Sequence, residues 1–183
     1  DAVTGRVFWK YRHQNADNAL VCCGANNRGV AVLNDKVYMG TLDAHLIALD
    51  RINGQVLWKA EVGDVNRAYS VTMAPLAVKD KIMVGVGGGE FGIRGYVAAF
   101  DAETGEQAWK TYTIPAPGEP NHDSWEGDDW EHGGAPVWIT GSFDPDLNLT
   151  YWGVGNPGPD WNAGQRPGDN LYSDSAIALD ADT

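Results

Sequence analysis

A ten-residue phrase that recurs along the 183-residue chain constrains its fold more than any other feature. In each complete copy an Asp is followed by a Gly four positions later and by Trp-Lys eight and nine positions later. Complete copies begin at Asp1, Asp50 and Asp101, and a fourth copy begins at Asp180. Spacings of 49, 51 and 79 residues with short apolar runs between them are typical of β-propellers or solenoids, not of a simple globule.

The residue types of the phrase have a direct structural interpretation. An alternating apolar run ends at the Asp, whose carboxylate can accept hydrogen bonds from turn amides, and the Gly supplies the positive φ of the turn. The next strand then carries Trp9, Trp58 or Trp109 at the same position. A solvent-exposed aromatic side chain does not explain three identical positions. We therefore expect each indole to dock neighbouring repeats, where it buries a large apolar area.

Each complete repeat is expected to contain four short antiparallel strands, which is the content of one propeller blade. The expected strands are 29–33, 36–40, 45–50 and 55–61 in the first repeat, and 73–78, 81–85, 96–101 and 106–113 in the second. A closed ring needs about 4–8 blades. The sequence therefore predicts an all-β fragment of a propeller, in which residues 1–183 form a partial domain of two to three blades truncated at both ends.

The charge balance argues against a nucleic-acid partner, and the hydrophobic pattern argues against a transmembrane segment. The chain has 13 Lys and Arg against 25 Asp and Glu, a formal net charge of −12. Such a chain repels phosphate backbones, which argues against nucleic-acid binding. No run of about 18 apolar residues occurs, so we expect no transmembrane segment.

The loops that differ between repeats mark the expected functional face. From the Gly that ends the second strand to the next Asp of the phrase there are 10 residues after Gly40, 16 after Gly85 and 27 after Gly153. The other irregular segments precede the first strand of each repeat, at 22–28, 69–72 and 123–138. The start of strand one and the end of strand two lie at the same end of an antiparallel blade. These loops should therefore converge on one face.

The two cysteines are adjacent, at Cys22 and Cys23. Neighbouring residues cannot join distant segments, so a framework disulfide is excluded. The pair is either two reduced thiols or a strained vicinal disulfide. Its place on the expected functional face favours the disulfide, which would also indicate an oxidising compartment.

Two oxygen-bearing side chains follow the same strand end on consecutive repeats. Glu90 comes after the glycine run 87–89, and Asn156 follows Gly155. Carboxylate and amide oxygens suit a hard cation such as Ca²⁺, although an exposed Glu and a turn Asn are the simpler alternative. Trp138 lies outside the repeating Trp positions, and it either stacks on a flat ligand or packs in the core. The four His residues show no metal-binding spacing.

The order and spacing of several motifs resemble one known family over the whole chain. These motifs are Cys22-Cys23 followed by Asn27-Arg28-Gly29, Gly88-Gly89-Glu90-Phe91-Gly92-Ile93-Arg94-Gly95, Gly133-Gly134-Ala135-Pro136-Val137-Trp138, Gly155-Asn156-Pro157 and Arg166-Pro167-Gly168-Asp169-Asn170. With the Trp phrase, they make the chain similar to an internal piece of a quinoprotein alcohol dehydrogenase. This is the methanol and ethanol dehydrogenase family, which depends on pyrroloquinoline quinone (PQQ).

The resemblance implies a set of site residues. Cofactor binding would involve Cys22, Cys23, Arg28, Thr72, Gly87, Gly88, Gly89 and Trp138, and the metal ligands would be Glu90 and Asn156. The vicinal disulfide would lie against one face of PQQ and Trp138 on the other. Arg28 and Thr72 would hold polar oxygens of the cofactor, and the glycines would present backbone to it. The metal would be Ca²⁺ or a lanthanide ion.

The resemblance also implies the fold and the activity of the parent protein. It would be an eight-bladed propeller that oxidises small primary alcohols to aldehydes in the periplasm and passes electrons to a cytochrome c. The general-base Asp of the family would lie beyond the C-terminal end of this chain, so we expect no catalytic residue within it and no activity from these residues alone.

Two departures and one alternative accompany the resemblance. Gly87 stands where many relatives have Ser, so one hydrogen bond to the cofactor is expected to be missing. Pro136-Val137-Trp138 is more typical of ethanol-type enzymes, which favours a broader primary-alcohol substrate. The alternative is a non-enzymatic propeller with PQQ-like repeats that acts as an assembly scaffold. Such a scaffold shares the Trp phrase but needs neither adjacent Cys nor the Gly-Gly-Glu loop.

Overall fold

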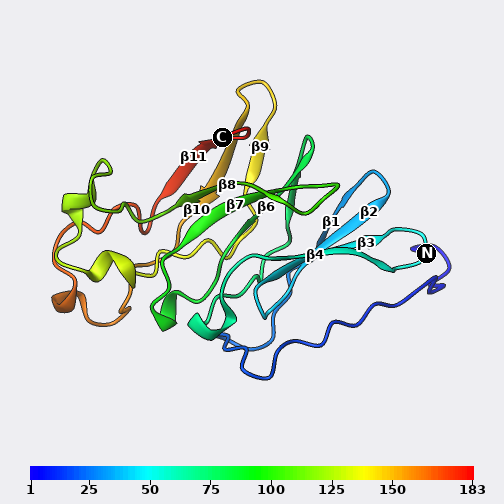
Figure 1. Cartoon of the computed structure of the whole chain (residues 1–183), viewed down its shortest axis with the longest axis horizontal. Helices are drawn as coiled ribbons and strands as arrows, with labels where there is room; N and C mark the ends of the chain where they lie inside the picture. The colour runs from blue at the N-terminus through cyan, green and yellow to red at the C-terminus, as the bar shows by residue number, and fades with distance from the viewer.

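The computed structural model describes residues 1–183 as three antiparallel sheets connected by loops and short 3₁₀ turns (Figure 1). The first sheet has the order β1 (Val30–Leu33), β2 (Lys36–Gly40), β3 (His45–Asp50) and β4 (Val56–Glu61). The second has the order β5 (Leu76–Val78), β6 (Lys81–Gly85), β7 (Tyr96–Asp101) and β8 (Gln107–Tyr112). The third has the order β11 (Ala176–Asp180), β10 (Leu149–Gly153) and β9 (Ser142–Asp144). The predicted all-β class is confirmed.

The predicted strands of the first two repeats are confirmed to within one residue, apart from the first strand of the second repeat. That strand was predicted at 73–78 but spans only Leu76–Val78. Pro75 precedes it and has no N–H to give to the ladder, which limits the pairing of β5 with β6 to three residues. Met73 is instead fully buried, and its sulfur accepts a hydrogen bond from the backbone N–H of Gly85 at 3.0 Å.

The hydrophobic core lies along the middle strands of the sheets and continues between them as one cluster. Every residue of β7 from Tyr96 to Phe100 is buried, whereas most residues of β4 and β8 are exposed or half-buried. The largest fully buried side chains include Trp152, Tyr38 and Tyr96. Burial on both faces explains why the middle strands read as nearly continuous apolar runs, while the outer strands alternate.

Polar contacts join each sheet to the next. The Tyr38 hydroxyl of β2 donates to the carbonyl oxygen of Ala102, just after β7, at 3.1 Å. The buried Lys36 ammonium reaches the Glu103 carboxylate at 2.8 Å. Between the second and third sheets, Lys79 pairs with Asp182 at 2.8 Å. These bonds lie at the turns that carry the phrase, so the repeats contact each other through equivalent parts.

The indoles of the phrase reach across to the following copy in the same way each time. Each indole Nε1 atom donates a hydrogen bond to the backbone oxygen of the residue directly after the Asp of the next copy. The pairs are Trp9 with Arg51 at 3.0 Å, Trp58 with Ala102 at 3.1 Å, and Trp109 with Ala181 at 3.4 Å. The Asp itself accepts the turn amides as expected. In the third copy the Asp101 Oδ1 atom accepts from the backbone amides of Glu103 and Thr104 at 2.9 and 2.7 Å.

Two features of the structure require glycine at the Gly position of the phrase. Its φ is positive, at +73° for Gly54 and +76° for Gly105. A Cβ atom at Gly105 would also lie 2.7 Å from the Trp58 indole, and the same clash of 2.5 Å arises between Gly54 and Trp9. The turn therefore provides a flat floor for the indole of the preceding copy.

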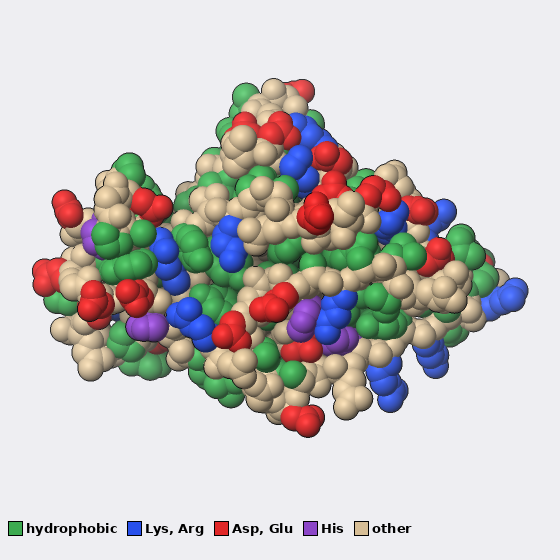
Figure 2. All heavy atoms as spheres, in the orientation of Figure 1, with side chains coloured by type: hydrophobic (Ala, Val, Ile, Leu, Met, Phe, Trp, Pro, Cys, Tyr) green, Lys and Arg blue, Asp and Glu red, His purple; other side chains and the backbone are tan.

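Two surface properties complete the fold. Acidic side chains are spread over the visible face of the molecule, with Lys and Arg between them (Figure 2), consistent with the net charge of −12. No helix of the structure has the length and apolar character needed to cross a bilayer.

The indole–glycine contact can be tested by Gly105→Ala in the full-length protein, with Gly118→Ala as the control. Both glycines have positive φ, +76° and +88°, but a Cβ at Gly118 has no neighbour within 4 Å. The left-handed backbone alone should cost each variant about 1–2 kcal/mol. Overpacking against Trp58 should add about 1–3 kcal/mol for Gly105→Ala only. Denaturant unfolding measures the difference, and equal losses would contradict the contact.

Candidate functional site

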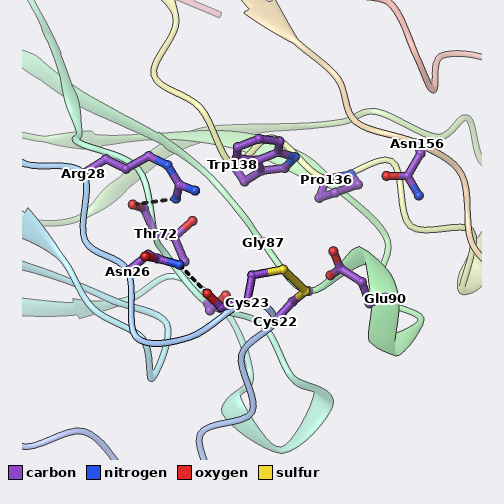
Figure 3. A pocket seen from close by; sticks show the side chains of 12 residues that line it. Cys22, Cys23, Asn26, Arg28, Thr72, Gly87, Glu90, Pro136, Trp138 and Asn156 are labelled. Carbon is purple, nitrogen blue, oxygen red and sulfur yellow. Dashed lines mark hydrogen bonds between the residues drawn. A yellow bond between two sulfur atoms is a disulfide. The ribbon is translucent and has the colours of Figure 1, made fainter. Parts of the chain in front are cut away.

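One pocket of about 290 Å³ collects the predicted site residues (Figure 3). Nine of the ten line it, namely Cys22, Cys23, Arg28, Thr72, Gly87, Gly88, Glu90, Trp138 and Asn156. Gly89 lies just outside. The pocket also contains Asn26 and Ser70, which the sequence analysis did not single out, and Pro136, which it named only as part of a motif. All of these residues come from the loops predicted to converge on one face.

Backbone pairing between these loops forms the rigid base of the pocket. Gly87, two residues beyond β6, exchanges backbone hydrogen bonds with Ser70 at 2.9 and 3.3 Å. Val137 donates to Val86 at 2.9 Å on the other side of the same segment. Further along, Gly155 donates to Pro136 at 2.8 Å. Loops from successive sheets are thus paired like short strands, which fixes their positions without a bound ligand.

Cys22 and Cys23 form a disulfide with each other, so the alternative of two reduced thiols is wrong for this structure. Cys23 has a positive φ of 65°. Its carbonyl oxygen accepts a hydrogen bond from the Asn26 side chain at 2.9 Å, which holds the loop after the disulfide. In Figure 3 the disulfide and Trp138 lie on facing sides of the pocket.

Arg28 joins the disulfide loop to the other side of the pocket. Its backbone N–H and its Nη1 atom both donate to the carbonyl oxygen of Thr72, at 3.1 and 3.2 Å. Its guanidinium carbon lies 4.9 Å from the centre of the Trp138 ring, within range of a cation–π contact. Trp138 is 39% exposed, so core packing, the alternative left open by the sequence, does not account for it.

The glycine run 87–89 is explained mainly by contacts within the chain. Gly88 has a φ of +114°, and a Cβ there would clash with the carbonyl oxygen of Ala68. A Cβ at Gly89 would lie 2.8 Å from the ring of Pro136. At Gly87 a Cβ would approach the Ser70 hydroxyl to 3.0 Å. Close packing of the loop therefore requires small residues here whether or not a ligand approaches the backbone.

Glu90 and Asn156 both bring unpaired oxygen atoms to the pocket. Glu90 lies in the single-turn helix η2 (Gly89–Phe91) and is exposed, and its carboxylate makes no hydrogen bond or ion pair within the chain. Asn156 follows β10, and its Oδ1 atom likewise accepts no hydrogen bond. The chain contains no group of three or more His, Cys, Asp or Glu residues suited to a metal. Glu90 and Asn156 are two hard oxygen donors, fewer than the about 6–8 oxygens that Ca²⁺ takes.

A buried carboxylate that the sequence analysis missed anchors the segment leading to the disulfide. Asp43, in the β2–β3 loop, is only 4% exposed. Its Oδ1 atom lies 2.9 Å from His13 Nε2 and 3.4 Å from His45 Nδ1, and its Oδ2 atom accepts from the backbone N–H of Ala16 at 3.2 Å. Burial by itself raises the pKa of Asp43. The hydrogen bonds from Thr41 and His13 and the charges of both histidines outweigh burial and hold that pKa well below its usual value.

His13 and Asp43 are 30 residues apart, and only the fold brings them together. Nothing in the spacing of residues along the chain pairs them, because neither residue belongs to a recognisable motif.

The acidic stretch 119–131 is held against the protein by its aromatic side chains. Its Trp125 is only 3% exposed, and the Nε1 atom donates to the carbonyl oxygen of Leu171 at 2.5 Å. Trp130 packs on the core edge-to-face with His122.

The antiparallel sheets, with equivalent contacts between the repeats and loops that line a polar pocket beside a vicinal disulfide, have the architecture of a β-propeller-type domain. Over residues 1–183 the chain matches the family described as "Glucose/ethanol/alcohol dehydrogenase, beta-propeller domain". The chain belongs to this family, and the resemblance noted in the sequence is confirmed.

Three relatives illustrate the match. The chain is 41% identical to the quinoprotein alcohol dehydrogenase PedH of Pseudomonas putida, covering 100% of this chain and 33% of that protein. It is 42% identical to a lanthanide-dependent methanol dehydrogenase of Methylacidiphilum fumariolicum, covering 97% and 32%. A solved structure titled "Europium-containing methanol dehydrogenase" superposes with a TM-score of 0.90 at 40% identity, covering 97% of this chain and 34% of that one.

These comparisons concern two expectations from the sequence, namely that the chain is part of a longer protein and that an assembly scaffold is the alternative. The chain spans about a third of the length of the curated relatives it matches. The relatives are dehydrogenases by name, so the assembly-scaffold alternative has no support from them.

The role of Asp43 in holding the N-terminal segment can be tested by Asp43→Asn in the full-length protein at pH 7. The lowered pKa of Asp43 means that its charge stabilises the fold above the usual Asp pKa, and that this contribution is lost only as the pH falls through the lower folded value. The neutral amide should weaken the contacts to His13 and Ala16. Hydrogen exchange should then become faster in residues 11–21 but not in β6 or β7.

Asp17→Asn is the matched control, because Asp17 lies in the same segment, is exposed and makes no side-chain hydrogen bond. Equal exchange rates for the two variants would show that Asp43 does not anchor the segment.

Proposed function

We propose that this chain is part of a PQQ-dependent alcohol dehydrogenase that oxidises primary alcohols of the methanol and ethanol class to aldehydes. Its contribution is a set of PQQ- and metal-binding residues. The observation that carries the proposal is the single pocket, which brings together a vicinal disulfide, an exposed indole, an arginine and two unpaired oxygen donors. Membership of the dehydrogenase family and the names of the relatives support it.

The pocket has the chemistry that a flat, anionic quinone requires. The Cys22–Cys23 disulfide and the Trp138 ring offer apolar, polarisable surfaces on facing sides (Figure 3), suited to the two faces of a ring system. Arg28 is the cationic side chain among the lining residues, and it would pair with a cofactor carboxylate or carbonyl oxygen. Thr72 would contribute a hydroxyl group. Gly87 offers none, but the neighbouring Ser70 places a hydroxyl beside it.

Glu90 and Asn156 fit a hard cation at the edge of the same pocket. An unpaired carboxylate and an unpaired amide oxygen are the donors that Ca²⁺ and lanthanide ions prefer. When bound, PQQ supplies a two-electron acceptor and the cation supplies Lewis acidity. The residues of this chain bind and orient these groups, and we assign no general base among them.

The full-length protein is proposed to be an eight-bladed propeller whose blades are joined by tryptophan docking. The three indole-to-backbone hydrogen bonds, each to the equivalent position of the next repeat, support this proposal. The sheets of this chain would be neighbouring blades, and the pocket would lie where their loops face the axis of the ring.

The surroundings of the enzyme are proposed from the same family. Cytochrome c is the proposed electron acceptor, since one relative of Methylobacterium organophilum is named "Methanol dehydrogenase [cytochrome c] subunit 1". A periplasmic location is proposed because the vicinal disulfide needs an oxidising compartment.

The activity is tested on the full-length protein supplied with PQQ and either Ca²⁺ or a lanthanide ion. Reduction of an artificial electron acceptor is followed spectroscopically while ethanol or methanol is added. We expect reduction that depends on both alcohol and PQQ. No alcohol-dependent reduction with either metal would contradict the proposed function.

The metal site is tested by Glu90→Gln in the same protein, with Glu106→Gln as the control. Glu106 is exposed and makes no side-chain hydrogen bond, so its loss should leave metal binding unchanged. Loss of a residue that only contacts a metal ligand typically weakens metal affinity by about 10–100-fold. As a direct ligand, Glu90 should have at least this effect when its charge is removed. Isothermal titration with Ca²⁺ or La³⁺ measures the affinity. Equal affinities of the two variants would show that Glu90 is not a ligand.

A further inference from the structure

The side-chain amide of Asn156 has a defined orientation in the pocket. Its Nδ2 atom donates to Asp160 Oδ1 at 2.7 Å and to the carbonyl oxygen of Pro157 at 3.2 Å. An amide nitrogen carries two hydrogens, and both are used by these bonds. Its Oδ1 atom accepts no hydrogen bond within the chain, and in Figure 3 it points toward the interior of the pocket.

The opposite orientation of this amide is excluded by the same two neighbours. Rotation by 180° would place Oδ1 against the Asp160 carboxylate and the Pro157 carbonyl, so that three acceptors would face each other without a proton between them. The hydrogen-bond network is the criterion that distinguishes the two orientations of an Asn amide. Asp160 therefore determines that an oxygen, and not a nitrogen, faces the pocket.

The loop that carries Asp160 is itself held firmly to the rest of the chain. Pro157 and Gly158 are buried, and the Gly158 N–H donates to the carbonyl oxygen of Gly133 at 2.8 Å. The backbone N–H of Asn162 then closes a turn onto Pro159 at 3.4 Å. Asp160 is half-buried between these fixed points, so its carboxylate stays within reach of Asn156.

We propose that Asp160 is a positioning residue for the metal site. It holds the Asn156 amide with Oδ1 free for the cation. This inference rests on the proposed function, because it takes Asn156 as a metal ligand. A cation on Oδ1 polarises the amide and makes its N–H groups stronger donors, so the charge-assisted bond to Asp160 and the bond to the metal strengthen each other.

Two substitutions separate this orienting role from a general effect of charge. Asp160→Ala removes the charged acceptor and leaves only the more distant Pro157 carbonyl to oppose rotation of the amide. Asp160→Asn keeps an oxygen that can accept from Asn156 Nδ2 but removes the charge. Asp169→Ala is the matched control, because Asp169 lies in the same loop, is exposed and makes no side-chain hydrogen bond.

The experiment measures La³⁺ and Ca²⁺ affinity by isothermal titration in the full-length protein with PQQ present, and the thermal midpoint of the metal-free protein. Asp160→Ala should weaken cation affinity by about 10–100-fold, the range typical of a residue that orients a metal ligand. Asp160→Asn should recover a large part of this loss, and Asp169→Ala should match the wild-type protein. The metal-free midpoints of Asp160→Asn and wild type should agree.

Three results would overturn the inference, and they are distinguishable. If the wild-type protein binds neither cation, the proposed metal site fails and this inference fails with it. If the wild type binds and Asp160→Ala behaves as Asp169→Ala, only the positioning role fails. If Asp160→Asn loses as much cation affinity as Asp160→Ala, the carboxylate does not act by orienting the amide. The same conclusion holds if Asp160→Ala does not fold and Asp160→Asn no longer binds the cation.

Discussion

The hydrogen bond from the indole of each phrase to the backbone of the next is the interaction on which the rest of the structure depends. It fixes the distance between successive sheets, because the indole lies on a glycine that admits no side chain and its Nε1 atom reaches one defined carbonyl oxygen. Sheets spaced in this way present their loops on a common face. The place of the pocket therefore depends on the contacts between the repeats.

Hydrogen bonds hold the backbone of the pocket in place, whereas two of its side chains carry oxygen atoms without a hydrogen-bond partner. Loops from successive sheets pair through main-chain hydrogen bonds at Ser70, Gly87 and Pro136, so little ordering is left for a ligand to impose. At the same time Glu90 and the Oδ1 atom of Asn156 have no partner in the chain. A preformed frame with free polar groups lowers the entropic cost of binding, which is what a cofactor site requires.

Much of the fold followed from the sequence because its strands are short, regular and ended by turn residues. Lys36–Gly40, His45–Asp50 and Tyr96–Asp101 begin and end where the apolar runs and the turn residues beside them placed them. Leu76–Val78 is shorter than expected because Pro75 cannot join the ladder, although the preceding residues are apolar. The loops that line the candidate site followed as well, since irregular loops at one end of antiparallel sheets must meet, and the family resemblance supplied the roles of their residues.

The sequence by itself determined the repeat, the strands and the residues that gather at one face, because all of these depend on local periodicity and turn chemistry. Only the tertiary structure decided which of these residues touch. It paired His13 with Asp43, set Arg28 against Trp138, and turned the Asn156 amide by means of Asp160. The physical reason is that hydrogen bonds and ring contacts depend on direction and on distances of about 3–5 Å. Such distances arise from the packing of whole sheets and leave no trace in the spacing of residues along the chain.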